Sequence, residues 1–304
     1  MTKKPNLIVI VGPTGAGKTS LAIELAKKLN ADIVSADSRQ IYKEIPIGTA
    51  APSASQLKSA KHHFVGTLSV TDYYNVSMFE SDVLKLLETY FKEKKTMIMV
   101  GGSGLYIDAV CKGIDALPDA DEDLRGELND FFSKEGIEGL RKKLELLDPV
   151  YYNTVDLDNP KRLLRAIEVC LLTGMPFSQQ RKGKKAERPF NIIKIGLELP
   201  RGQLYEIIES RLSVMLNDNW LEEARTVFGF RNENALNTVG YKELFKFLNG
   251  EWDLETAKEK IKVNTRRYAK RQMTWFKRDN EINWFSPDDR KDIFDFVAKN
   301  IRPL

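Results

Sequence analysis

The stretch that decides the fold is LIVIVGPTGAGKTSLAIELAKKL, Leu7 to Leu29. It opens with a short, β-branched apolar run, LIVIV, which predicts a buried strand. The segment GPTGAGKT at 12–19 follows directly and matches the G-x-x-x-x-G-K-[ST] phosphate loop. Apolar residues then recur at helical spacing, so a strand, a loop and a helix are predicted in the order that this motif requires.

The residue types in this loop suit a bound di- or triphosphate. Its glycines allow successive backbone N–H groups to converge on an anion at the start of a helix. The Lys18 ammonium is placed for the terminal phosphates and the Thr19 hydroxyl for Mg²⁺. A chance glycine-rich turn is the alternative, and the flanking strand and helix argue against it. The predicted phosphate-binding residues are Gly12, Pro13, Thr14, Gly15, Ala16, Gly17, Lys18 and Thr19.

The composition indicates a main domain with a smaller second one. The chain has 304 residues, of which 42% are apolar, enough for a sizeable core. It contains no apolar stretch of membrane-spanning length, and its polar first residues are too few for a signal peptide, so we expect a soluble, cytoplasmic protein. Cys111 and Cys170 lie in apolar segments and are expected to be reduced, structural thiols. Nothing in the sequence demands more than a monomer.

Positive charge is concentrated in two blocks, although the net charge is only +4. Residues 258–278 hold nine basic side chains and one acidic one, and residues 161–188 hold eight basic and two acidic ones. Either block alone is equally well explained as a solvated helix face. Two blocks in a phosphate-binding chain favour a polyanionic partner.

A second short strand is predicted at 31–37 and ends on Asp37. In an open parallel sheet the carboxyl ends of the strands face the ligand crevice, so this carboxylate should point toward the phosphate site. A helix cap is the alternative role for an aspartate at this position. The histidines at 62 and 63 fall in a predicted loop and have no partner at metal-ligand spacing beside them, so a structural or phosphate-proximal role is favoured.

A further strand, glycine turn and helix are predicted at 96–110. The strand runs into Gly101 and Gly102, where nucleotide hydrolases carry an aspartate that helps to hold magnesium. The missing carboxylate disfavours an ordinary ATPase and leaves Asp37 as the nearest candidate acid or base. The paired glycines predict close approach of the backbone to a ligand, with Ser103 as a local donor.

From 115 to 189 the alternation of strand and helix stops. A helix is predicted at 161–172, and Lys161, Arg162 and Arg165 lie within about one turn of it. A basic loop at 181–188 closes the segment. We therefore predict an α/β fold with a P-loop-containing parallel sheet flanked by helices. Its core comprises 1–114 and 190–304, with a strand at 190–199 and a largely helical C-terminal part, and 115–189 form a helical insertion.

Seven segments carry a resemblance: GPTGAGKT at 12–19, DSRQIY at 37–42, IGTA at 47–50, GGSGLY at 101–106, NPKRLLRAIEV at 159–169, VGYKE at 239–243 and TRRYAKRQMTWFKR at 265–278. In this order, over nearly the whole chain, they resemble the bacterial tRNA dimethylallyltransferases, also called tRNA isopentenyltransferases. The ordered set is far more specific than the phosphate loop alone. Ser103 stands where the family usually has threonine, and the hydroxyl is kept.

The resemblance implies transfer of a dimethylallyl group from dimethylallyl diphosphate to N6 of an adenine beside the tRNA anticodon, at position 37 of the tRNA. Pyrophosphate is released. The phosphate loop then holds the diphosphate of the prenyl donor, with Mg²⁺ as cofactor, and no phosphoryl group is transferred. That role explains why no carboxylate follows the strand at 96–100.

The resemblance also implies roles for particular residues. Lys18, Mg²⁺ on Thr19, and Arg211 stabilise the charge that develops on pyrophosphate; a surface helix arginine is the alternative reading of Arg211. An adenine amino group is a poor nucleophile, so a base that removes its proton is useful, and Asp37 fits that role by type and position. The residues implied in binding the tRNA anticodon stem loop are Asp37, Ser38, Arg39, Gln40, Ser103, Arg125, Lys161, Arg162, Leu163, Leu164 and Arg165.

Three other readings stay open from the residues. Tyr268 and Trp275, on the basic helix near the C-terminus, either stack on RNA or belong to the core. A nucleotide or small-molecule kinase is the main rival function, because a phosphate loop is common to both reaction classes. A non-catalytic RNA-binding protein that uses the loop as an anion clamp is the third.

Overall fold

The structure is a computed structural model that describes residues 4–181, 183 and 186–301, and the chain divides into two compact units. The first, which we call the core unit, comprises Met1–Cys111 and Glu187–Leu304, and the second, the helical unit, comprises Lys112–Ala186. The predicted insertion spanned 115–189, three residues later at each end than the helical unit. The basic loop predicted at 181–188 lies partly outside the described residues.

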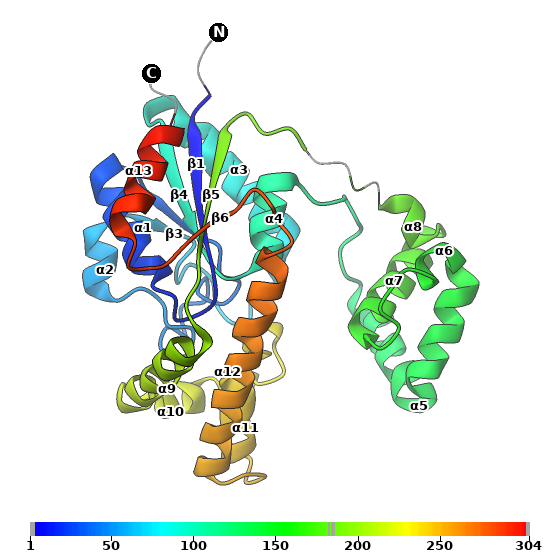
Figure 1. The fold of residues 1–304 in the computed structure, drawn as a ribbon. Coiled ribbons are helices and arrows are strands. Elements are labelled where there is room, and N and C mark those ends of the chain that lie inside the picture. Colours follow the sequence, from blue (N-terminus) through cyan, green and yellow to red (C-terminus); the bar gives the residue numbers. More distant parts are fainter. Residues whose placement is uncertain (1–3, 182, 184–185, 302–304) are drawn as a thin grey trace. The chain divides into compact units, whose positions relative to one another are not determined.

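The centre of the core unit is a six-stranded sheet in the order β3-β2-β4-β1-β5-β6, and every strand pair is parallel (Figure 1). The predicted parallel sheet is thus confirmed, including the return of the chain at β5 beside β1. Two short edge strands were not predicted: His62 and His63 were placed in a loop, but they pair with Ile33 and Val34. The strands are β1 (Asn6–Val11), β2 (Ile33–Ser35), β3 (His62–His63), β4 (Thr96–Val100), β5 (Asn191–Leu197) and β6 (Asn283–Phe285).

Helices cover both faces of this sheet because its strands are apolar on both sides. Leu7 and Val9 of β1 pack into one layer, against α3 and α4, while Ile8 and Ile10 pack into the other, against α1 and α13. Both cysteines are buried and neither takes part in a disulfide, as predicted. The helices of the core unit are α1 (Lys18–Leu29), α2 (Ala54–Ser59), α3 (Val76–Glu93), α4 (Gly104–Lys112), α9 (Arg201–Asn217), α10 (Trp220–Thr226), α11 (Tyr241–Leu248), α12 (Leu254–Phe276) and α13 (Arg290–Asn300).

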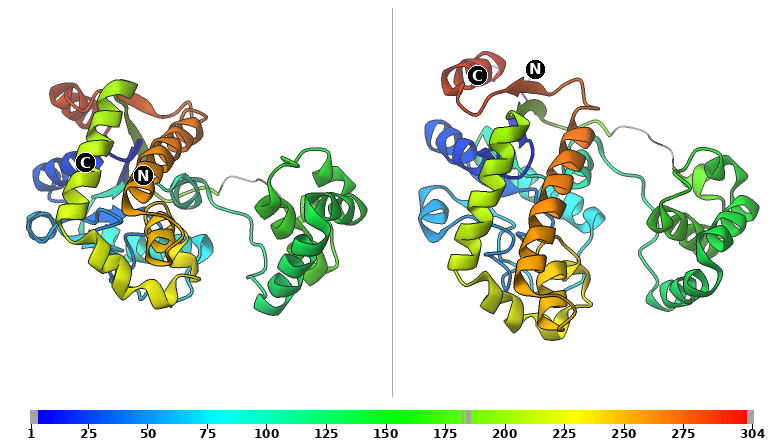
Figure 2. Two further views of the ribbon diagram at one scale, coloured as in Figure 1. Left: turned by 90° about the horizontal axis from the view of Figure 1, so that it is seen from below. Right: turned by 60° about the horizontal axis from the view of Figure 1, so that its bottom comes forward.

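Four of these helices, α9 to α12, lie beyond the carboxyl ends of the strands (Figure 1). Helices α9 and α12 run side by side, and Leu204 and Ile208 of α9 pack against Ala269 of α12 (Figure 2). This is the predicted helical C-terminal part. Its position means that ligands bound at the strand ends meet helix side chains from a distant part of the sequence.

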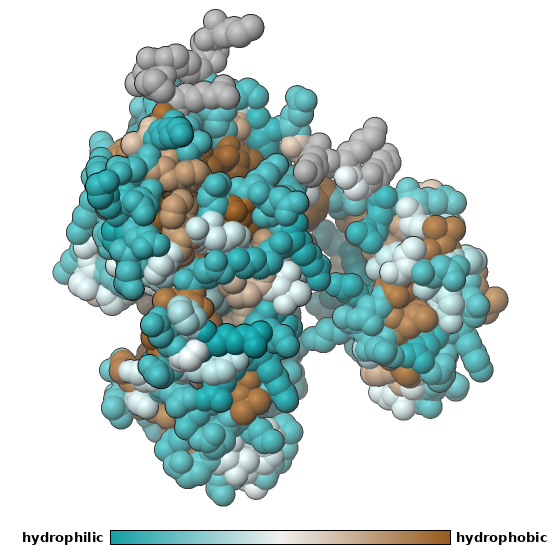
Figure 3. All heavy atoms as spheres, in the orientation of Figure 1, coloured by the Kyte–Doolittle hydropathy of each residue, from teal (hydrophilic) through white to brown (hydrophobic). Residues whose placement is uncertain are grey.

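The helical unit contains α5 (Glu122–Leu147), α6 (Pro149–Tyr152), α7 (Pro160–Thr173) and α8 (Phe177–Gln180). Helix α5 is kinked at Gly136, whose φ of 65° lies in the left-handed region that favours glycine. Leucines of α5 and α7, together with Phe177, form a separate core. The face of the molecule seen in Figure 3 is mainly hydrophilic. Among the described residues, no helix combines the length and the apolar character needed to cross a bilayer.

Candidate functional site

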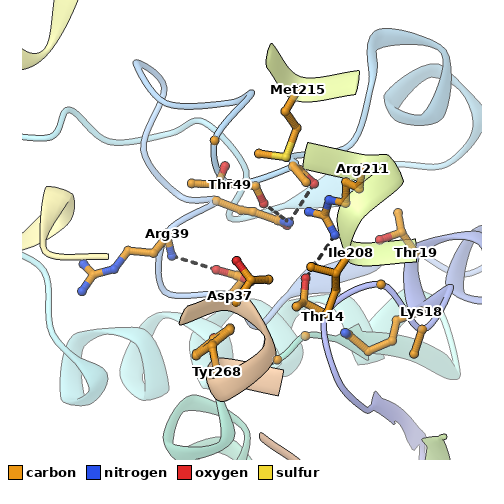
Figure 4. Close-up of a pocket in the computed structure, with 18 of the residues that line it drawn as sticks. Thr14, Lys18, Thr19, Asp37, Arg39, Thr49, Ile208, Arg211, Met215 and Tyr268 are labelled. Carbon is orange, nitrogen blue, oxygen red and sulfur yellow. Dashed lines mark hydrogen bonds between the residues drawn. The ribbon is translucent and has the colours of Figure 1, made fainter. Parts of the chain in front are cut away.

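A pocket of about 430 Å³ lies at the carboxyl ends of β1, β2 and β4 (Figure 4). Its wall combines the loops that follow these three strands with one face of α9 and one face of α12. Lys18 and Asp37 both line it, as the argument from strand ends predicts. The pocket therefore places the phosphate loop and the candidate base in a single cavity.

The phosphate loop leads into a helix whose first backbone N–H groups have no side-chain cap. Gly15 and Gly17 have φ angles of 88° and 75°, and Gly17 caps α1 without any side-chain hydrogen bond. By contrast, α3, α5, α7 and α12 each begin with an Asn or Asp side chain that accepts a backbone N–H. Because the first N–H groups of a helix have no partner within it, the start of α1 is free to bind an anion.

Not every predicted loop residue reaches the cavity. Residues Thr14 to Thr19 line it, while Gly12 and Pro13 lie behind them. A Cβ at Gly12 would lie 2.5 Å from the carbonyl oxygen of Leu197, so only glycine fits there. The Pro13 carbonyl accepts a 2.7 Å hydrogen bond from Lys18 Nζ. These two residues shape the loop from behind, and Thr14 to Thr19 form its surface toward the pocket.

Two cations border the pocket with unusual pKa values. Burial lowers the pKa of Lys18 to about 8; Asp37 opposes this shift and Arg211 adds to it. Burial likewise lowers the pKa of Arg211, again opposed by Asp37. Nη1 of Arg211 donates to Thr14 Oγ1 at 3.1 Å, which fixes the guanidinium beside the phosphate loop (Figure 4). The alternative reading of Arg211 as a surface residue is therefore wrong.

Asp37 is held by a turn of its own backbone and does not cap a helix. Its Oδ1 accepts the N–H of Arg39 at 2.9 Å, and the residues that follow form turns. In Figure 4 the Arg39 side chain extends away from Lys18 and Thr14. The Gln40 carboxamide donates to the carbonyls of Thr49 and Ala50 and accepts from the Ser35 hydroxyl. The Gln40 carboxamide therefore holds the loop around 47–50. Few of its hydrogen-bonding groups remain for the predicted contact with tRNA.

The paired glycines allow protein atoms to approach them closely. A Cβ at Gly101 would lie 2.1 Å from the Ala36 carbonyl oxygen, and one at Gly102 would lie 2.1 Å from Nε2 of Gln272. Both glycines also line the pocket, and their close approach to a ligand stays a prediction. Next to them, Ser103 Oγ accepts the Ser38 N–H at 3.0 Å, which ties this loop to the turn that holds Asp37.

Apart from Arg211 and Tyr268, sequence reasoning missed the helical part of the pocket wall. Gln272, on α12, is 5% exposed and bonds both to the phosphate loop and to Gly102. The sequence did contain a signal for this wall. The pocket residues of α12 recur at intervals of three and four, as do those of α9, so each set shares one face of its helix. The α12 set is Ile261, Thr265, Tyr268 and Gln272, and the α9 set is Ile207, Ile208, Arg211, Leu212 and Met215. With Trp220 and Val239, these residues form a largely apolar wall.

Tyr268 and Trp275 of α12 differ in which of the two readings, RNA stacking or core packing, fits them. Tyr268 lines the pocket, and burial raises the pKa of its hydroxyl above the ordinary tyrosine value. Trp275 packs against the core, and its Nε1 donates to Asp108 at 2.8 Å. Core burial is therefore the better account of Trp275, while Tyr268 is placed for a ligand.

The residues of the helical unit that are implied in tRNA binding differ in how available they are. Lys161 and Arg162 are exposed at the start of α7. Arg125 and Arg165 both bond to Glu168, which is 1% exposed; Arg125 is exposed and Arg165 is half-buried. Leu164 is half-buried at the edge of the helical core. Leu163 is fully buried there, so its side chain has no surface to offer RNA.

The donor set in the pocket fits magnesium held mainly by a substrate. Among the described residues, no group of three or more His, Cys, Asp or Glu side chains is arranged to hold a metal ion. Thr19 contributes one hydroxyl to the pocket wall. Mg²⁺ keeps several waters and takes few protein ligands together with substrate phosphates, so one hydroxyl beside a bound diphosphate suits it.

Comparison with known proteins agrees with this geometry. The chain is 50% identical over 302 residues to tRNA dimethylallyltransferase 1 of Bacteroides fragilis, covering 99% of this chain and 100% of that protein. A solved full-length tRNA isopentenylpyrophosphate transferase from Bacillus halodurans is 33% identical, with a TM-score of 0.73, covering 98% of this chain and 97% of that chain. A eukaryotic dimethylallyltransferase acting on tRNA shares the fold, with a TM-score of 0.78 at 23% identity over 99% of this chain and 81% of that one. Residues 40–279 match the IPP transferase family model, and the chain belongs to that family.

Proposed function

We propose that this protein transfers the dimethylallyl group of dimethylallyl diphosphate to N6 of the adenine beside the anticodon of a tRNA. One observation carries the proposal. A single pocket holds an anion site at the start of α1, a carboxylate at Asp37 and an apolar wall from α9 and α12. These are the three surfaces that a prenyl diphosphate and a nucleobase amine require together.

The diphosphate is bound by the phosphate loop. The unpaired N–H groups at the start of α1, the Lys18 ammonium and the Arg211 guanidinium surround it with donors and positive charge. These groups stabilise the negative charge that grows on the leaving pyrophosphate as the allylic C–O bond breaks. Thr19 would hold Mg²⁺, which would supply further positive charge to the leaving group. The five-carbon tail lies against the apolar side chains of α9 and α12.

The adenine is bound near Asp37. As N6 forms its bond to the terminal allylic carbon, the Asp37 carboxylate accepts the N6 proton, and pyrophosphate leaves with the electron pair of the broken C–O bond. A base inside a stacked loop cannot reach this carboxylate, so the target adenine leaves its stack. Arg39, which lines the pocket, contacts the extruded nucleotide, as do Ser38 and Ser103, which bond to each other beside Asp37; Tyr268 offers it a ring for stacking.

Binding to the tRNA anticodon stem loop rests on phosphate contacts. Lys161 and Arg162 are exposed on α7, and Arg125 and Arg165 lie beside them around Glu168. Such contacts release counterions, so the affinity falls as salt rises. We further propose that the protein acts in the cytoplasm as a monomer.

The direct test is incubation of the purified chain with radiolabelled dimethylallyl diphosphate, Mg²⁺ and bulk tRNA. We expect label to enter the RNA, on an adenine that nuclease digestion places beside the anticodon. Protein without RNA, and RNA without protein, are the controls. RNA that remains unlabelled, while the same protein phosphorylates a metabolite from ATP, would overturn the proposal in favour of a kinase.

Thermal unfolding separates the donors without requiring turnover. A ligand that binds only the native state raises the melting temperature. Dimethylallyl diphosphate should do so more than ATP at equal concentration, since its tail fits the apolar wall. Stabilisation by ATP alone would contradict this expectation.

A further inference from the structure

Gln272 of α12 lies buried between two loops of the pocket that follow different strands. Its Oε1 accepts the N–H of Thr14, in the phosphate loop, at 2.9 Å. Its Nε2 donates to the carbonyl of Gly102, in the loop between β4 and α4, at 3.0 Å. One carboxamide thus joins the loop that binds the donor diphosphate to the loop that lies beside the adenine site.

The two partners demand a carboxamide. A backbone N–H can only donate and a carbonyl can only accept, so the oxygen must face Thr14 and the nitrogen must face Gly102. An ionised glutamate would lack the donor, and methionine would lack both functions. Gly102 makes the contact possible, because a Cβ there would lie 2.1 Å from Nε2. The glycine and the glutamine therefore depend on each other.

Hydrogen bonds continue from this bridge on both sides. Thr14 Oγ1 accepts from Nη1 of Arg211 at 3.1 Å, which leads to a cation of the diphosphate site. On the other side, Ser103 follows Gly102, accepts the Ser38 N–H at 3.0 Å and donates to the Ser38 hydroxyl at 3.3 Å. Ser38 is the residue after Asp37. The bonds thus run from a diphosphate-binding arginine to the turn that carries the candidate base.

We propose that Gln272 is a positioning residue that couples diphosphate binding to RNA binding. A diphosphate bound to Arg211 and to the loop amides restricts the motion of Thr14. Because Gln272 bonds to both loops, the motion of Gly102 and Ser103 is restricted as well. The adenine side is then ordered before RNA arrives, so each ligand tightens the binding of the other by the same factor. The inference rests on the proposed function for the identity of the two ligands.

The coupling can be measured without chemistry. The dissociation constant of an anticodon stem-loop RNA is determined by fluorescence anisotropy with and without saturating inorganic pyrophosphate and Mg²⁺. We expect pyrophosphate to tighten RNA binding about fivefold or more in the unaltered protein. In Gln272→Met the coupling factor should fall to about one, whatever the affinity of each ligand alone. Gln203→Met, at an exposed position of α9, is the matched control and should keep the coupling.

A second variant separates positioning from mere packing. In Gln272→Glu the introduced carboxyl can donate to Gly102 only when it is protonated, and burial raises the pKa of such a group. The coupling should therefore be absent at high pH and return as the pH falls, relative to the unaltered protein at each pH. A packing role predicts no such dependence, and this variant also decides the matter if Gln272→Met fails to fold.

Two results would overturn the inference. One is an unaltered protein in which pyrophosphate leaves RNA affinity unchanged; the other is a folded Gln272→Met variant, or a Gln272→Glu variant at high pH, that keeps the full coupling. The prenyl-transfer assay on the unaltered protein keeps the two proposals apart. If it labels tRNA but shows no coupling, only the role of Gln272 fails, whereas a protein that never labels RNA refutes the proposed function itself.

Discussion

Asp37 and Lys18 influence each other across the pocket although they belong to different strand-end loops. Asp37 raises the pKa of Lys18 against the larger effect of burial, which lowers it. The balance leaves Lys18 with a pKa of about 8, close enough to neutral pH for its charge to respond to ligands. Single substitutions at these two positions should therefore separate proton removal from diphosphate binding.

Asp37→Asn should abolish most transfer while keeping the site intact. The asparagine Oδ1 can still accept the Arg39 N–H, so the turn persists, but the base is gone. We expect the single-turnover rate to fall about 10²- to 10⁴-fold, with little loss of donor affinity by calorimetry. Asp72→Asn is the matched control, because Asp72 accepts the Ser69 N–H in an exposed turn. Transfer by Asp37→Asn at the parental rate would remove Asp37 from the role of base.

Donor affinity should weaken as the pH rises above about 8. Since the pKa of Lys18 is lowered to about 8, Lys18 of the ligand-free protein is largely uncharged between pH 8 and the ordinary pKa of lysine. A bound diphosphate favours the charged form, so binding above pH 8 takes up a proton and the dissociation constant rises by up to about tenfold per pH unit. The same shift costs stability at neutral pH, where the unfolded lysine holds its proton more tightly, and this cost disappears as the pH rises.

Calorimetry of donor binding in buffers of different ionisation enthalpy measures that proton uptake. Lys18→Met should show weak binding with no rise in the dissociation constant over this pH range. A dissociation constant that stays constant between pH 7 and 9 in the unaltered protein would show that Lys18 does not titrate there.

At the scale of elements, the loop that follows β2 is held by α10. The Glu223 carboxylate accepts the N–H groups of Ile47 and Gly48 at 2.7 and 2.8 Å and also accepts the hydroxyl of Tyr241. Burial and this carboxylate raise the pKa of Tyr241, so the hydroxyl keeps its proton and remains a donor. A Cβ at Gly48 would lie 2.2 Å from Nε1 of Trp220, which explains the glycine in IGTA.

Glu223→Gln should loosen this loop. The amide replaces one accepting oxygen with a donor, so at least one N–H loses its partner, at a cost of about 1–3 kcal/mol in the free energy of unfolding. Because Gly48 and Thr49 line the pocket, the KM for the donor should rise as well. Urea unfolding and donor kinetics measure the two effects. The neighbouring Glu222→Gln alters only an exposed ion pair with Arg225 and should behave like the unaltered protein. Equal stability and KM for the two variants would show that Glu223 does not hold the loop.

Across the whole molecule, the cations implied in binding differ in their surroundings. In the core unit Lys18 and Arg211 line a pocket, whereas in the helical unit Lys161 and Arg162 are exposed at a helix start. Exposed charges are screened by salt and buried ones much less. RNA binding and donor binding should therefore respond differently to ionic strength.

Arg162→Glu should weaken tRNA binding and leave donor binding unchanged. Loss of one phosphate contact lowers the slope of log Kd against log salt by about one. Filter binding of tRNA at several salt concentrations measures this slope, and calorimetry measures the donor. Lys142→Glu, exposed on α5, is the control for net charge. If both variants shift the slope equally, the start of α7 has no special role in RNA binding.

The sequence by itself determined the phosphate loop, the strands that precede Lys18 and Asp37, the parallel sheet and the family. Each of these is encoded by neighbours in the chain: GPTGAGKT shapes its loop through local backbone geometry, and a strand end sets the edge at which Asp37 emerges. The short strands β3 and β6 were not predicted from the sequence, because two or three residues show no periodicity.

Only the tertiary structure decided how the pocket is closed. Gln272 meets Thr14 across 258 positions of the chain, and Gly102 is a glycine because that side chain arrives beside it. Leu163 sits in a basic segment, yet it faces a core formed with α5. Such contacts depend on how separate helices pack, and spacing along one helix shows only which residues share a face, not what that face meets.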